Sequence, residues 1–164
     1  MDSTMSELKV ETADREITMT RAFDAPRDLV FEAFTQNEHL KAWWGPRDWP
    51  IGESRLDFRV GGTWHFSLRG SDGTEAWNVG EYLVIEPPSK IVCTNAFADA
   101  EGNALGPQVE ITLTFEDAGP QRTLFTMRSR FASNEDRDMQ LQRGVTEGFR
   151  ETFERLEEHL VTMR

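Results

Sequence analysis

The residue clusters on which most catalysis and metal binding depend are missing from this sequence. The three histidines, His39, His65 and His159, have none of the short spacings that bring metal ligands together, and no Cys-x-x-Cys or His-Glu-x-x-His motif occurs. There is also no Gly-x-Ser-x-Gly nucleophile elbow and no phosphate-binding glycine loop. We therefore predict no catalytic residue, no metal site and no cofactor. The sequence leaves open whether the protein is an enzyme.

A few polar side chains fall within predicted strands and could reach the interior. Arg128 could recognise an anionic group of a ligand if it points inward, where it would need a carboxylate partner; on the outer face it would simply be solvated. Asn95, Glu81 and Glu110 are further candidates, and a buried carboxylate with a raised pKa could act as a general acid or base. Cys93 lies in an apolar strand and is interpreted as a small core residue.

The segment Trp43–Pro46 places two adjacent tryptophans directly before Gly-Pro. Neighbouring indoles cannot both point into one helix face, and the proline prevents the helix from continuing. Large apolar side chains are thus concentrated at a corner of the chain, where they either seal a core or line the entrance of a cavity. We predict that Trp43 lines such a cavity, with corner packing as the alternative.

Other aromatic residues are placed to share that cavity. Trp64 and Phe66 lie on one face of a predicted strand, and Tyr82 is assigned to the inner face because its phenol brings a polar group to an apolar wall. Gly144 and Gly148 in the last helix are best explained by close packing or by space left for a ligand. The alternative is that these aromatic residues are ordinary core. The predicted ligand-binding residues are Trp43, Trp64, Phe66, Tyr82, Asn95, Arg128, Phe149 and Phe153.

The elements that would position these residues follow from hydrophobic periodicity. Residues 15–23 alternate as a strand, and Pro26 opens the first of two short helices, the second of which ends at Trp43. Six further strands are predicted at residues 53–58, 63–68, 75–86, 91–97, 109–115 and 123–131. Ser133 or Asn134 can cap a final helix, whose apolar stripe continues unbroken from Leu141 to Leu160.

Length and charge limit the class of protein. The 164 residues suffice for one domain with its own core, which we assign to residues 15–164 after a flexible tail at residues 1–14. A net charge of −11 argues against nucleic acid and anionic membranes as partners. The single cysteine, the polar N-terminal segment and the lack of an apolar run of about 20 residues predict a cytoplasmic protein. A homodimer is left open.

Four motifs in order resemble one family. They are Trp43–Pro46, Asp57–Trp64, the strand from Gly80 that runs into Pro87–Val92, and Gly148–Leu156. The chain is similar over residues 15–161 to proteins related to the activator of the heat shock protein 90 ATPase. These belong to the START or birch-pollen-allergen-like superfamily, also called SRPBCC. Two positions differ from the usual pattern: Val60 replaces a proline, and Asn95 replaces a bulky aromatic residue and would place an amide on the cavity wall.

The resemblance implies an α+β helix-grip fold. In that fold a curved antiparallel sheet of six or seven strands holds two short helices after its first strand, and a long C-terminal helix crosses its concave face. The leading functional hypothesis is a non-enzymatic binding domain, whose cavity between sheet and helix binds a small, largely apolar molecule. Two alternatives are an enzyme of the polyketide cyclase or aromatase type that uses the same cavity, and a partner module for the heat shock protein 90 chaperone.

Overall fold

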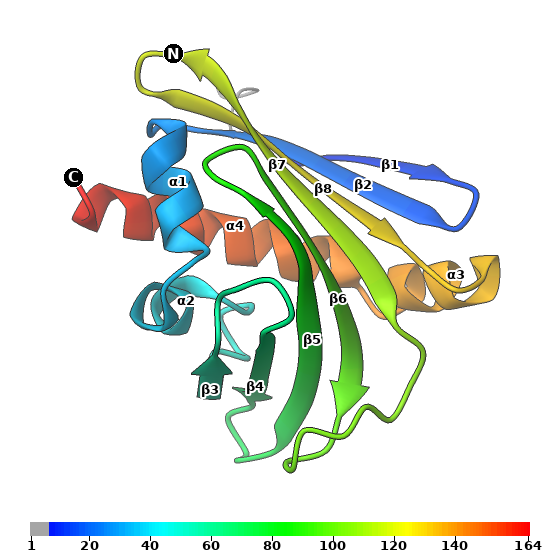
Figure 1. Cartoon of the computed structure of the whole chain (residues 1–164). Helices are drawn as coiled ribbons and strands as arrows, with labels where there is room; N and C mark the ends of the chain where they lie inside the picture. The colour runs from blue at the N-terminus through cyan, green and yellow to red at the C-terminus, as the bar shows by residue number, and fades with distance from the viewer. Residues whose placement is uncertain (1–6) are drawn as a thin grey trace.

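A computed structural model describes residues 7–164 as an eight-stranded antiparallel sheet with four helices (Figure 1). The strand order across the sheet is β1-β2-β8-β7-β6-β5-β4-β3. The strands are β1 (Lys9–Ala13), β2 (Glu16–Phe23), β3 (Ile51–Leu56), β4 (Thr63–Arg69), β5 (Glu75–Glu86), β6 (Lys90–Ala98), β7 (Val109–Gly119) and β8 (Arg122–Arg130). The helices are α1 (Arg27–Ala33), α2 (Asn37–Trp43), α3 (Asn134–Gln142) and α4 (Val145–Thr162).

Helix α4 crosses the concave face of the sheet, and α1 and α2 pack beside it toward its C-terminal half (Figure 1). Phe153, Leu156 and Leu160 are fully buried, because their spacing of three and four residues places them on the side of α4 that faces the sheet. The predicted helix-grip arrangement, with a long helix laid across a curved sheet, is confirmed.

The number of strands differs from the prediction by one. Seven strands coincide with the predicted ones, and the eighth is β1, which pairs with β2 from Lys9 opposite Thr20 to Ala13 opposite Glu16. The prediction of a flexible tail over residues 1–14 is therefore wrong for β1, whereas residues 1–6 lie outside the described residues. Strand β1 was missed because only Val10 among its residues packs against the core, which leaves no apolar alternation to recognise.

The C-terminal helix is also divided in two, not continuous from residue 135. Gly144 adopts a left-handed conformation with φ of 84°, and this ends α3 and begins α4. Ser133 caps α3 as expected, its hydroxyl accepting a hydrogen bond of 3.1 Å from the Asp136 amide. None of the helices in residues 7–164 is long and apolar enough to cross a membrane.

A group of phenylalanine rings packs between the helices and the sheet. Phe125 contacts Phe153 of α4 at 5.3 Å between ring centroids, Phe34 at 5.2 Å and Phe115 at 5.4 Å. Phe23 completes this group, and all five side chains are buried. We call these five residues the phenylalanine core. The remaining part of the concave face, beneath α2 and across β4 to β6, is packed differently.

Candidate functional site

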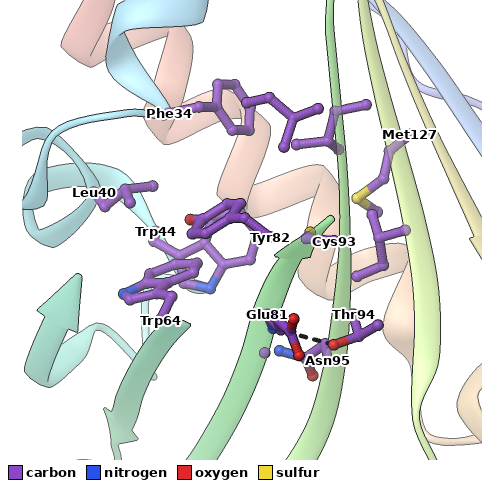
Figure 2. Close-up of a pocket in the computed structure, with 14 residues that line it drawn as sticks. Phe34, Leu40, Trp44, Trp64, Glu81, Tyr82, Cys93, Thr94, Asn95 and Met127 are labelled. Carbon is purple, nitrogen blue, oxygen red and sulfur yellow. Dashed lines mark hydrogen bonds between the residues drawn. The ribbon is translucent and has the colours of Figure 1, made fainter. Parts of the chain in front are cut away.

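A small cavity lies on the concave face between α2 and strands β4 to β8 (Figure 2). The space open to the centre of a water molecule is about 50 Å³. The cavity is lined by Phe34, Leu40, Trp44, Trp64, Gly80, Glu81, Tyr82, Ile91, Cys93, Thr94, Asn95, Ile111, Leu113 and Met127. Its lining is predominantly apolar, as in binding sites for small organic molecules.

The inner end of the cavity consists of hydrocarbon and thioether side chains. Ile91, Leu113 and Met127 come from three neighbouring strands, β6, β7 and β8, and Phe34 closes the space from the end of α1. All four are at least nine-tenths buried. A polar group placed here would lose its contacts with water and gain no hydrogen bond from these residues.

Tyr82 and Cys93 form the middle of the wall and face each other across β5 and β6. The Tyr82 side chain is 6% exposed, and its ring packs edge-on against Phe58 at 4.9 Å between centroids. Burial raises the pKa of the Tyr82 phenol, with a smaller contribution from Cys93, and burial raises the pKa of the Cys93 thiol to about 12. Both groups are therefore protonated at neutral pH, and Cys93 is no thiolate nucleophile.

The opposite end of the cavity is polar. Glu81, Thr94 and Asn95 lie together there (Figure 2), and the Glu81 amide donates a hydrogen bond of 3.1 Å to the Thr94 hydroxyl. Strands β5 and β6 approach each other closely at this point. A Cβ on Gly80 would lie only 1.9 Å from the Thr94 carbonyl oxygen, so the position requires glycine. The strand register then shifts between Tyr82 and Val84, and this fixes which side chains of β5 face inward.

Two tryptophans close the side of the cavity next to α2. The rings of Trp44 and Trp64 meet edge to face at 5.2 Å between centroids. The Trp64 indole donates a hydrogen bond of 2.8 Å to the Ser54 hydroxyl, which in turn donates one of 2.6 Å to the Asn37 side chain of α2. This chain of hydrogen bonds fixes the orientation of the Trp64 ring.

The corner that carries Trp44 is held by α4. The Arg155 guanidinium donates hydrogen bonds to the carbonyl oxygens of Ala42, Trp44 and Gly45 at 2.9, 3.2 and 2.8 Å. Burial lowers the pKa of Arg155 from its ordinary value, and the nearby charge of Arg47 adds to the effect. Three backbone carbonyls accept hydrogen bonds from its guanidinium. Gly45 has φ of 95°, and a Cβ there would lie 2.3 Å from the Trp49 carbonyl oxygen. The backbone of Trp44 is therefore tightly constrained, while its side chain is only partly buried.

Comparison with known proteins identifies the family. The family described as Activator of Hsp90 ATPase homolog 1-like protein matches residues 24–161 of this chain. The chain belongs to this family. None of the curated proteins compared with the chain matches it.

Solved structures show the same fold over nearly the whole chain. A protein from Arthrobacter aurescens, solved by NMR, is 28% identical with a TM-score of 0.87, covering 94% of this chain and 91% of that one. One from Staphylococcus epidermidis is 26% identical with a TM-score of 0.84 and 95% coverage of each chain. A Rhodobacter sphaeroides protein at 21% identity and a TM-score of 0.85 covers 95% of this chain and 99% of that one, and shows the fold alone. A START-like fold of this kind supports a ligand-binding module in general terms.

In this member of the Hsp90 ATPase activator homolog 1-like family, three of the eight predicted site residues line the cavity. Trp64, Tyr82 and Asn95 come together from β4, β5 and β6. Phe66 lies immediately behind, stacked on Trp64 at 4.0 Å between ring centroids and 3% exposed. The amide of Asn95 contributes to the polar end of the cavity.

The other four predicted residues do not line the cavity. Trp43 is fully buried, and its indole donates a hydrogen bond of 3.0 Å to the Ala33 carbonyl, so it holds α2 against the end of α1. The prediction chose the wrong indole of the pair, because the helix ends at Trp43 and the extended backbone at Trp44 directs the next side chain to the cavity. Arg128 is exposed, on the opposite face of β8 from Met127, so its inward placement is also wrong.

Phe149 and Phe153 lie beside the cavity, one turn apart on α4. Phe153 is fully buried in the phenylalanine core. Phe149 is partly buried and packs against Trp44 at 5.9 Å and Phe153 at 5.5 Å between centroids. Phe149 therefore supports the tryptophan wall from outside the cavity.

Several lining residues were missed by the sequence analysis. Met127 and Ile111 could have been found from the period-2 alternation of their strands, which places them on the same face as Phe125 and Leu113. Cys93 was recognised as an interior residue but not as part of a cavity wall. Within residues 7–164 no group of three or more His, Cys, Asp or Glu side chains is arranged to hold a metal ion.

Proposed function

We propose that the protein binds a small, largely apolar molecule in the cavity beneath α2. The observation that carries this proposal is a cavity whose inner end is lined by Phe34, Ile91, Leu113 and Met127 while its other end is polar. Transfer of apolar surface from water into such a space is favourable by roughly 25 cal/mol per Å². The START-like fold and family membership support the same function.

The size of the cavity favours a small ligand, no larger than about one aromatic ring. The space open to a water centre is about 50 Å³, whereas pockets for drug-sized ligands measure about 300–1,000 Å³. A larger ligand requires displacement of the Trp44 ring, which is only partly buried and packs against Trp64, Phe66 and Phe149. The cavity therefore selects ligands first by their size.

Toluene binding to a cavity-filling variant tests this function. Ile111→Phe adds volume to the cavity wall, and Thr112→Phe adds the same ring to the other face of β7 as a matched control. We expect toluene to shift the NMR signals of Trp64 and Tyr82 in the wild type. Ile111→Phe should weaken this binding by at least about tenfold, which corresponds to about 1.4 kcal/mol, while Thr112→Phe leaves it within about twofold.

Both variants are first compared by melting temperature, because overpacking alone destabilises by about 1–3 kcal/mol. Equal loss of toluene affinity in the two folded variants, or no toluene-induced shifts in the wild type at millimolar concentration, would refute the proposal.

A further inference from the structure

We infer that the ligand of this cavity is an uncharged molecule with a hydrogen-bond acceptor, to which the Tyr82 hydroxyl donates. This inference deepens the proposed function and rests on it, since it specifies the ligand class of the same cavity. It starts from a polar group in an apolar wall, the phenol of Tyr82.

The Tyr82 side chain is 94% buried, and its hydroxyl makes no hydrogen bond within the described residues 7–164. Its oxygen is not completely enclosed, since the fully buried side-chain polar atom without a partner in this range is Arg122 Nε. The hydroxyl can therefore donate to a molecule in the space beside it, and tyrosine hydroxyls within apolar surroundings ordinarily have such a partner. The hydroxyl end of the ring points toward α2, on the side of Leu40 (Figure 2), and Tyr82 lines the cavity. A molecule in the cavity is therefore the partner that this hydroxyl can reach.

The position of Tyr82 is fixed, so that its hydroxyl is held ready for a ligand. Its backbone exchanges hydrogen bonds with the Gly61–Gly62 turn: its amide donates to the Gly62 carbonyl at 3.0 Å and its carbonyl accepts from the Gly61 amide at 2.8 Å. The ring packs edge-on against Phe58, which itself contacts Phe31. A preorganised donor loses little conformational freedom when the ligand arrives.

The lining favours an uncharged ligand over an anion or a cation. No lysine or arginine is among the lining residues, so a bound carboxylate would be desolvated without a counter-charge. The single carboxylate, Glu81, is solvent-exposed at the polar end, away from the inner residues Phe34 and Leu113. The chain as a whole carries a net charge of −11, which further disfavours anions.

The protonation states match this assignment. Because burial raises the pKa of Tyr82, its phenol remains a donor throughout the neutral and mildly alkaline range. The Cys93 thiol, whose pKa is about 12, remains neutral beside it. The ligand thus meets one strong neutral donor in the middle of the wall and hydrocarbon at the inner end. We expect an aromatic ring at the inner end, with a carbonyl or similar acceptor directed at Tyr82.

A pair of probes that differ only in the acceptor tests the inference. Acetophenone and α-methylstyrene have nearly the same planar shape, but the first has C=O where the second has C=CH₂. Tyr82→Phe removes the hydroxyl and keeps the ring. We expect this variant to lower acetophenone affinity about 3- to 10-fold, the range for one neutral hydrogen bond, and to leave α-methylstyrene affinity unchanged or slightly higher.

Two controls complete the experiment. Cys93→Ala alters the same part of the wall without touching the hydroxyl, and should change the affinities of both probes by the same factor. Benzoate and benzylamine, tested as anion and cation against wild type at pH 7, should each bind at least about tenfold more weakly than acetophenone, because a buried charge lacks a partner.

The outcomes separate this inference from the proposed function. If both neutral probes bind and Tyr82→Phe affects them equally, or if either charged probe binds as tightly as acetophenone, the ligand class is wrong while apolar binding stands. If neither neutral probe nor toluene binds to the wild type, both proposals fail. Melting temperatures of Tyr82→Phe and Cys93→Ala verify that the compared proteins are folded.

Discussion

The two parts of the concave face differ in how completely side chains fill the space beneath the helices. In the phenylalanine core, rings from β2, β7, β8, α1 and α4 meet at centroid distances from 5.2 to 6.2 Å, and all are buried. Around the cavity, the corresponding positions on β5 to β7 hold Gly80, Cys93 and Ile111, which are smaller. The sheet is continuous between the two parts, so the cavity results from side-chain size and not from a change of fold.

The difference shows how one framework combines stability with a binding site. The phenylalanine core has the close packing typical of protein interiors, which makes its residues intolerant of truncation. The cavity is closed by two tryptophans whose rings are only partly buried. The Trp44 carbonyl accepts a hydrogen bond from Arg155, and the Trp64 indole donates one to Ser54. We therefore expect the phenylalanine core to contribute most to stability and the cavity wall to adapt to a ligand.

The largest contrast is expected from truncating one phenylalanine in each part. Phe153→Ala should lower the free energy of unfolding by about 3–5 kcal/mol, because its ring is fully enclosed. Phe149→Ala, one turn away on α4, should lower it by only about 1–2 kcal/mol, because that ring is partly exposed and relaxation around it is easier. Urea denaturation of both variants measures these values. Equal destabilisation would mean that the two parts are packed alike.

Phe149→Ala should also alter the cavity, since Phe149 supports Trp44 from behind. We expect larger aromatic probes such as naphthalene to bind more tightly to Phe149→Ala than to wild type, with no such gain in Phe153→Ala. Titration followed by tryptophan fluorescence measures both affinities. If only Phe153→Ala bound naphthalene more tightly, the prediction would be contradicted, because the adaptable wall would then lie in the phenylalanine core.

An intermediate effect is expected from two glycines on either side of the tryptophan corner. Gly45→Ala should destabilise by about 1–3 kcal/mol, because φ is 95° there and the Cβ would lie 2.3 Å from the Trp49 carbonyl oxygen. Gly148→Ala is the matched control in α4, where the nearest atom to a new Cβ is Pro46 at 3.8 Å. This second change should stabilise by up to about 1 kcal/mol through helix propensity. Thermal melts of both variants decide whether the corner is as constrained as its geometry indicates.

The smallest effect concerns pH and the contact between α2 and α4. His39 Nδ1 and His159 Nε2 are 2.8 Å apart, within hydrogen-bonding distance, and Glu32 of α1 lies 3.5 Å from the other nitrogen of His39. Burial, and then the proximity of His39, lower the pKa of His159. The unfolded chain thus binds more protons than the folded one as pH falls below about 6.5, so stability should decrease there.

We expect this loss to stay below about 1 kcal/mol, because His159 is only partly buried. His159→Gln removes the titrating group and should flatten the dependence of the melting temperature on pH between 7 and 5. A dependence as steep in His159→Gln as in the wild type would assign the effect to other residues.

Much of the fold could be predicted because its signals are local. The alternation in β2, β4 and β8, the capping of α3 by Ser133 and the Gly-Pro stop after α2 each depend on neighbouring residues only. The same local signals could have placed Arg128 outward, since Met127 beside it faces inward and neighbouring side chains in a strand alternate. The break at Gly144 was not predicted, because the apolar stripe continues on both sides of it.

By itself, the sequence determined the family and the helix-grip architecture, because motif order and strand periodicity are properties of the chain. It named Trp64, Tyr82 and Asn95 as candidates for the cavity wall without deciding which side chains face inward. The tertiary structure alone decided that Trp44 and not Trp43 borders the cavity. It also decided that Phe153 is core and that the Tyr82 hydroxyl lacks a partner among the described residues. These outcomes depend on where a helix ends against its neighbours and on how much volume distant side chains leave unfilled, and neither quantity is encoded in the spacing of nearby residues.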